Sequence, residues 1–337
     1  MKSRLIAGVT SFVFAVTVLS GVHLSAQQTS SSSQSNAVAN SMRVTPVRTD
    51  LALDPGDSKT IEVSAQNLTP ETVNLRAILS DFEASKDESG EPLVIMDDSY
   101  AESHSLKRLA TISPEEITLG PNQTAKVAVT ITAPQSARAG GYYGTVRFTS
   151  ANQIEQEGSG VAVATNVGSL VLLRINGDLV EKMSLASVDV RQKDGDAKGF
   201  FSTNKDLKVV TRFNNEGNIQ LQPYGKIQIL DRSGKVVEEH EVNGGSPRGN
   251  VLPESIRRFE TKLDKVGTFG KYTLQANFGY GEGGQLLTAK STFWVVPTTY
   301  IIGGAIGLLV LAGIIFLIVR VITLSRRGGG RSHGRRY

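Results

Sequence analysis

The chain of 337 residues has no cysteine, a single tryptophan and only four histidines. Without cysteine it has no disulfides, no thiol nucleophile and no lipidated amino terminus of the bacterial lipoprotein kind. The histidines lie far apart, at His23, His104, His240 and His333. This leaves no His/Cys metal cluster and little room for a Ser-His-Asp triad, so we expect no cofactor, no metal site and no enzymatic activity.

Charged residues are missing from residues 301–319, a run of 19 apolar or small residues. This is about the length that a helix needs to cross the hydrocarbon core of a bilayer. The sequence therefore predicts a transmembrane helix over residues 300–324. Acidic residues are also missing after this run, whereas six arginines follow it: Arg320, Arg326, Arg327, Arg331, Arg335 and Arg336. By the positive-inside rule, residues 325–337 form a basic cytoplasmic tail and the preceding chain lies outside the cell membrane.

The amino-terminal end agrees with this orientation. Lys2 and Arg4 precede an apolar stretch at residues 5–24, and Ala26 offers a small residue at a cleavage point. Residues 1–26 are thus predicted to be a signal peptide, with an uncleaved anchor as the alternative. Residues 27–41 are rich in Ser, Gln and Asn and are predicted to be a disordered leader. An exported region without cysteine favours a bacterial protein.

The basic net charge of +4 arises from the two ends of the chain. When Lys2, Arg4 and the six arginines near the carboxyl end are set aside, 28 basic and 32 acidic residues remain, a net charge of −4. The basic balance therefore reflects membrane topology, and we expect no nucleic-acid partner.

Residues 42–178 show short alternating strands separated by turns. Alternation of apolar and polar residues predicts strands at 59–66, 72–80, 125–132, 141–150 and 161–175. No amphipathic helix interrupts them. This pattern is typical of an immunoglobulin-like β-sandwich without its usual disulfide.

A second set of strands fills residues 179–297. Strands are predicted at 183–190, 207–213, 225–230, 235–242, 256–262, 271–280 and 286–296. The turn at residues 231–234 (DRSG) predicts that the strands 225–230 and 235–242 form a hairpin. The predicted fold class is therefore all-β, with two immunoglobulin-like β-sandwich domains and one C-terminal transmembrane helix. Three residues, 297–299, separate the second domain from the membrane. Trp294 either lies in the core of its strand or, with Tyr300, marks the membrane interface.

Acidic residues gather in the irregular stretch 81–112, around 87–91 and 97–98. Their spacing does not follow a known Ca²⁺ loop, so we interpret them as the solvated tip of a hairpin. Residues 252–255 (LPES) lack the Thr-Gly pair of a sortase motif and are predicted to be a turn.

Several motifs together resemble one family. They are residues 51–63 (LALDPGDSKTIEV), 117–134, 140–144 (GGYYG) and 163–177 (VATNVGSLVLLRING). In this order they look like the peptidoglycan-binding domain of the WxL-interacting cell-surface proteins of Gram-positive bacteria, and residues 214–218, 223–231 and 252–255 resemble the second extracellular domain more loosely. The resemblance implies that the first domain contacts peptidoglycan or another cell-wall glycan and that the second contacts a surface protein partner or a host component.

Tyr143 and Arg147 are the candidate ligand-binding residues. In the strand that begins at Gly140, alternation places Tyr142, Val146 and Phe148 toward the core. Tyr143 and Arg147 then point outward, where they could stack on sugar rings and pair with carboxylates.

Two other functions remain open besides a cell-surface protein that binds the wall. One is a membrane-tethered assembly or chaperone-like protein that adds a strand from a polypeptide partner to an exposed sheet edge. The other is an exported hydrolase that uses paired carboxylates, which would need a cleft where two of them meet.

Overall fold

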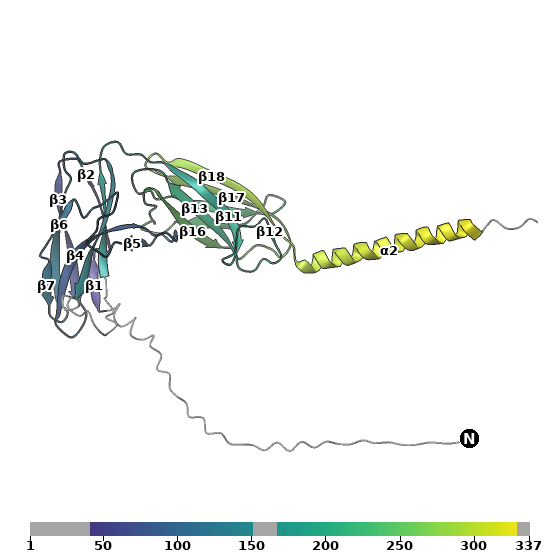
Figure 1. Ribbon diagram of the computed structural model, residues 1–337, viewed down its shortest axis with the longest axis horizontal. Coiled ribbons are helices and arrows are strands. Elements are labelled where there is room, and N and C mark those ends of the chain that lie inside the picture. Colours follow the sequence, from purple (N-terminus) through teal and green to yellow (C-terminus); the bar gives the residue numbers. More distant parts are fainter. Residues whose placement is uncertain (1–40, 151–166, 329–337) are drawn as a thin grey trace, which may run out of the picture.

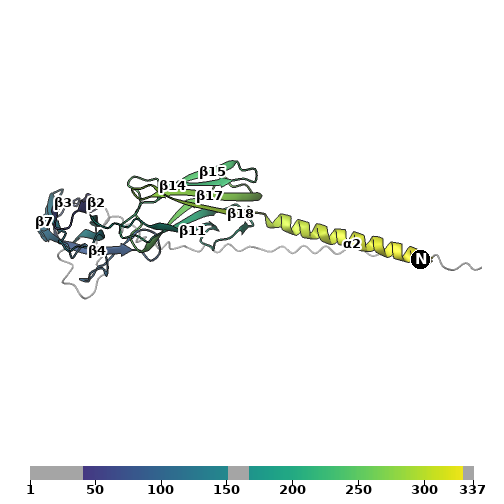
Figure 2. The same cartoon turned by 90° about the horizontal axis from the view of Figure 1, so that it is seen from above.

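The computed structural model describes residues 41–150 and 167–328, which form two β-sandwich domains followed by one long helix (Figure 1). The predicted fold class is confirmed. The two domains and the helix follow one another along an elongated molecule (Figure 2). The predicted signal peptide, nearly all of the leader and most of the basic tail lie outside the described residues.

The first domain packs two sheets face to face. One has the strand order β1-β3-β8-β6, with the bounds Met42–Thr45, Ser58–Asn67, Thr124–Thr132 and Ala110–Ser113. The other has the order β2-β10-β9-β4-β5, with the bounds Arg48–Leu53, Val167–Ile175, Gly140–Ser150, Val73–Ala84 and Pro92–Val94, and β7 (Glu116–Leu119) also pairs with β4. The strand predicted at 161–175 begins at Val167 in the described part, and residues 161–166 lie outside it.

Alternation along the long strands builds the core of this domain. Val63 and Ala65 on β3 and Val127 and Val129 on β8 are fully buried, and they face Phe148 on β9. Each of these valine and phenylalanine side chains stabilises the fold by about 1.5–3 kcal/mol when it leaves water. The polar residues between them face outward, as the period of two requires.

The second domain has the same two-layer construction. Its smaller sheet has the order β11-β13-β16, with the bounds Met183–Gln192, Leu207–Asn215 and Ser255–Lys262. Its larger sheet has the order β12-β18-β17-β14-β15, with the bounds Phe200–Phe201, Gln285–Val295, Gly270–Tyr280, Tyr224–Leu230 and Val236–Val242. The predicted hairpin of β14 and β15 is confirmed by their antiparallel register.

The helix α2 (Thr298–Gly328) starts two residues before the predicted span. Within Thr298–Thr323, the most apolar stretch of 18 residues has a mean hydropathy of 2.9, and none of this stretch is buried inside the protein. A helix of this length and composition is able to cross a bilayer. A soluble core helix would instead pack its apolar side chains against the domains.

Candidate functional site

The two domains meet at the outer face of the sheet that contains β9 and β10. Phe82, Tyr143 and Leu172 form a small buried cluster on this face, separate from the cores of both domains. Leu252, from the turn before β16, packs against them. The turn predicted at residues 252–255 is thus present at Pro253 and Glu254, and Leu252 just before it serves as a contact between domains.

The face assignment for Tyr143 and Arg147 is correct, but the prediction that they are exposed is wrong. Their exposed fractions are 2% and 6%. Alternation fixes the face on which a side chain lies, but it does not show what covers that face. Here the second domain covers Tyr143, while Arg147 donates from Nε and Nη2 to Oγ of Ser80 at 3.0 and 2.9 Å. A glycan-binding role for the pair stays a prediction, and neither side chain offers an exposed stacking surface.

Polar contacts join the domains around Tyr143. Its hydroxyl donates to Oε1 of Gln220 at 2.9 Å, and the backbone N–H of Gly141 donates to the carbonyl of Asn218 at 2.8 Å. Burial raises the pKa of Tyr143, so the phenol remains a neutral donor. Arg174 on β10 adds an ion pair with Glu282 at 2.6 Å. The relative position of the two domains is therefore fixed by directional bonds as well as by apolar contact.

The hairpin of β4 and β5 extends from the first domain onto the second. Glu88, at its tip, binds the guanidinium of Arg212 with both carboxylate oxygens, with Nε of Arg212 2.7 Å from Oε2. The Glu88 carbonyl also accepts from the N–H of Arg258 at 2.8 Å, at the edge of β16. The hydrogen bonds from Arg212 hold the pKa of the Glu88 carboxyl below its ordinary value. The interpretation of this stretch as a solvated tip is thus wrong at Glu88, although the neighbouring Asp87 is exposed.

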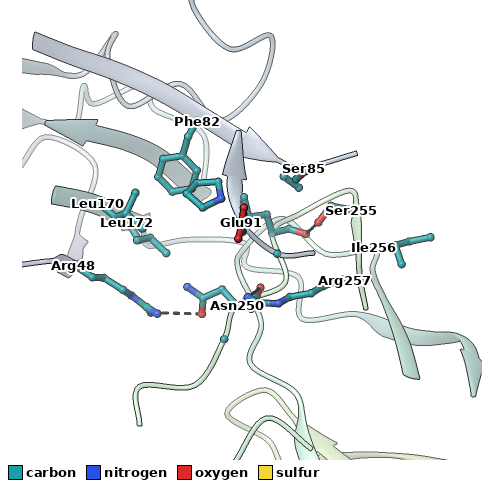
Figure 3. Close-up of a pocket in the computed structure, with 15 residues that line it drawn as sticks. Arg48, Phe82, Ser85, Glu91, Leu170, Leu172, Asn250, Ser255, Ile256 and Arg257 are labelled. Carbon is teal, nitrogen blue, oxygen red and sulfur yellow. Dashed lines mark hydrogen bonds between the residues drawn. The ribbon is translucent and has the colours of Figure 1, made fainter. Parts of the chain in front are cut away.

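A pocket of about 130 Å³ lies between this hairpin, β10 and the chain before β16 (Figure 3). Phe82, Leu170, Leu172 and Leu252 supply its apolar wall. Its polar end is formed mainly by Arg48 and Arg257, one from each domain, with Asn250 between them (Figure 3).

The two arginines are held differently. Arg48 forms a bidentate ion pair with Asp50, with both N–O distances at 2.7 Å. Arg257 donates from Nη1 to the carbonyl of Asn250 at 2.7 Å, but its buried Nε has no hydrogen-bond partner. Burial lowers the pKa of Arg257, which reflects the cost of removing a guanidinium from water. This unpartnered Nε is closed to solvent and lies against Gly90, so the pocket offers mainly its apolar wall to a ligand.

The strand β2 borders this pocket and forms an open sheet edge. It pairs only with β10, in parallel, and no strand of the described part of the chain covers its other side. The N–H of Leu170 donates to the Val47 carbonyl, and the N–H of Asn176 donates to the Leu53 carbonyl. These two bonds show which backbone groups of β2 face β10 and which face away from it. In a parallel ladder with this register, the backbone groups of Arg48, Asp50 and Ala52 point away from β10.

A second groove runs beside this open edge. Its volume is about 460 Å³, and it is walled by Arg48 and Asp50 from β2 and by Gln222, Tyr224 and Arg248 from the second domain. The guanidinium of Arg248 lies 4.1 Å from the centre of the Tyr224 ring. Unpaired backbone groups and a groove lined by side chains from both domains thus occur together.

The charged groups near the two grooves do not form a metal site. No group of three or more His, Asp or Glu side chains that could hold a metal ion occurs among residues 41–150 and 167–328. Near β2 the carboxylates of Asp50 and Glu282 are each bound to an arginine. The hydrolase alternative stays a prediction.

Sequence reasoning missed this site, although one signal for it was present. Residues Leu170–Val171–Leu172–Leu173 form a continuous apolar run in β10. Such a run is typical of a strand that is buried on both faces, whereas a sandwich strand with one solvated face would alternate. The run therefore indicates a covered outer face, and the cover is the second domain.

No family model and no curated protein matches the chain. Among solved structures, the chain is similar to the class 5 fimbriae chaperone CfaA, with 13% identity and a TM-score of 0.37, over 76% of this chain and 99% of that one. It is also similar to the CupB2 chaperone of Pseudomonas aeruginosa, with 11% identity and a TM-score of 0.33, over 74% and 98%, and to the E. coli chaperone DraB, with 13% identity and a TM-score of 0.33, over 76% and 96%. Likeness at this level concerns the arrangement of strands and carries no inference about what this chain binds.

Proposed function

We propose that this protein is a membrane-tethered, polypeptide-binding ectodomain of the assembly or chaperone-like kind, which adds an extended segment of a partner protein to the edge of β2. The observation that carries the proposal is the open edge at Arg48, Asp50 and Ala52, which lies beside a groove between the domains. Strand addition draws affinity from main-chain hydrogen bonds and specificity from pockets for alternate side chains. The open edge of β2 and the groove beside it supply both on one surface.

The side chains around the edge of β2 favour a partner segment that has both apolar and polar residues. The pocket in Figure 3 offers an apolar wall to one side chain of the added strand, and the guanidinium of Arg48 lies at its polar end. The second groove places Arg248 and Tyr224 along the same path. We therefore expect the partner segment to alternate apolar residues with polar or acidic ones.

The wall-binding function predicted from the family resemblance has less support. Its candidate ligand-binding residues, Tyr143 and Arg147, are both buried. The proposal of strand addition depends on the geometry of this chain alone.

The proposal can be tested with a displayed library of short peptides, selected on the full-length protein in lipid nanodiscs. The substitution Ala52→Pro removes an outward N–H while the bonds of Leu51 and Leu53 to β10 remain, because proline is tolerated on an edge strand when its N–H would face solvent. We expect Ala52→Pro to abolish binding of the selected peptides and Ala52→Thr to retain it. Equal binding to the two variants would contradict the proposal.

A further inference from the structure

Four exposed aromatic side chains gather at the end of the second domain from which α2 leaves. Phe200, Phe269, Trp294 and Tyr300 have exposed fractions of 47%, 60%, 45% and 65%. The exposure of Trp294 shows that the core alternative for this residue is wrong. Large aromatic side chains are seldom left in water together unless a partner covers them.

Two side chains of this group form a row across the sheet together with a lysine. Phe200 on β12 is paired with Trp294 on β18, and Trp294 is paired with Lys271 on β17. Directly paired residues share a face, so all three lie on the outer face of the larger sheet. The ammonium of Lys271 lies 5.8 Å from the centre of the Trp294 ring.

The other two aromatic residues connect this end of the domain to the helix. The rings of Phe269, just before β17, and Tyr300, in the first turn of α2, lie 5.5 Å apart. Only Val296 and Pro297 separate β18 from α2. At about 3.3 Å per residue, Trp294 stands within roughly 13 Å of the start of the helix.

We propose that these residues, Phe200, Phe269, Lys271, Trp294 and Tyr300, form a platform that seats the end of the second domain in the headgroup region of the bilayer that α2 crosses. Aromatic rings with polar edges favour this region, and a lysine beside them meets lipid phosphates. Because the connection between β18 and α2 is short, the lipid surface always lies close to these five residues. The ectodomain is then held against the membrane at a defined orientation.

The only tryptophan of the chain is Trp294, so its fluorescence reports on the platform alone. The full-length protein is reconstituted into phosphatidylcholine vesicles that contain lipids brominated either close to the glycerol or near the methyl end of the acyl chain. We expect several-fold stronger quenching by the former and a blue-shifted emission. Water-like emission without quenching by either lipid would overturn the proposal.

A matched control moves the tryptophan to the other end of the same strand. Leu286 is 78% exposed and lies on the same face of β18 as Trp294, about 26 Å away at 3.3 Å per residue. In the double variant Trp294→Phe, Leu286→Trp we expect no quenching. Quenching of equal strength at position 286 would contradict a platform confined to the end next to α2.

A second copy of the chain is the other occupant that the experiment can detect. Blue-shifted emission without lipid quenching, which changes when the protein is diluted in excess lipid, would show that a neighbouring protein covers Trp294 and would overturn the lipid assignment. The variant Phe269→Ser should weaken quenching of Trp294 while the thermal unfolding temperature stays the same. This separates loss of the platform from loss of the fold.

Discussion

The carboxylate of Glu88 and the guanidinium of Arg212, 124 residues apart in the chain, bind each other with two hydrogen bonds across the domain interface. Both side chains are largely shielded from water, with exposed fractions of 22% and 28%. The tip of the β4–β5 hairpin is thereby held against β13, and the pocket beside it keeps its shape. The pair is therefore a positioning contact for the proposed binding surface.

Glu88→Gln should loosen this contact without disturbing either core. Hydrogen bonds to charged groups contribute about 1.5–3 kcal/mol, and we expect a loss of stability in this range from urea unfolding. Glu91→Gln is the matched control in the same turn, because Glu91 has no ion pair within the described part of the chain. The account is wrong if the two substitutions have the same effect.

The contribution of Glu88 should also depend on pH. Its pKa in the folded protein is lowered from 4.5 by the hydrogen bonds of Arg212. The stabilisation is therefore fully present above the ordinary pKa and is lost as the pH falls through the lowered one. The difference in unfolding free energy between the wild type and Glu88→Gln should shrink in this acid range. A difference that stays constant from neutral to strongly acid pH would rule out the ion pair as its cause.

Tyr143→Phe removes the hydrogen bond to Gln220 and keeps the ring in place. We expect a loss of about 1 kcal/mol, whereas Tyr143→Ala should cost about 3–5 kcal/mol because it also opens a cavity between the domains. Thermal unfolding measures both. Tyr142→Phe, whose hydroxyl donates at an exposed site to the Arg138 carbonyl, should have a smaller effect than Tyr143→Phe. The reverse order would show that the interface does not depend on Tyr143.

Asn215 ends β13 with a fully buried amide. It donates to the carbonyls of Ile219 and Val251 at 2.8 and 2.9 Å and accepts from the N–H of Gly217. Since each buried group left without a partner costs about 1–3 kcal/mol, Asn215→Ala should destabilise the second domain by more than about 2 kcal/mol. The neighbouring substitution Asn214→Ala should cost much less. Similar unfolding midpoints for the two variants would contradict this role.

Much of the fold could be predicted from the sequence because long sandwich strands carry their own signal. The alternation in β3, β8 and β9 predicts both that these segments are strands and which of their side chains face the core. The short strand β2 was missed because only Leu51 and Leu53 alternate there before the turn begins. A brief edge strand gives periodicity analysis too few residues.

The candidate site was harder to predict because it arises between domains. Tyr143 follows the same alternation whether its face is solvated or covered, so period alone cannot show its burial. Glu88 lies in an acidic turn that ordinarily faces water, and its partner Arg212 is distant in sequence. Phe200 and Phe269 were missed in the same way, because only pairing across β12, β17 and β18 brings them to the end where α2 begins.

Strand addition at β2 can be tested most directly by hydrogen exchange of the backbone amides of Arg48, Asp50 and Ala52. The full-length protein in nanodiscs would be measured alone and with a peptide selected from the displayed library. The account predicts that these amides exchange quickly without peptide and become protected with it, whereas those of Thr49 and Leu51, already bonded to β10, change little. Peptide binding that leaves Arg48, Asp50 and Ala52 unprotected would contradict it.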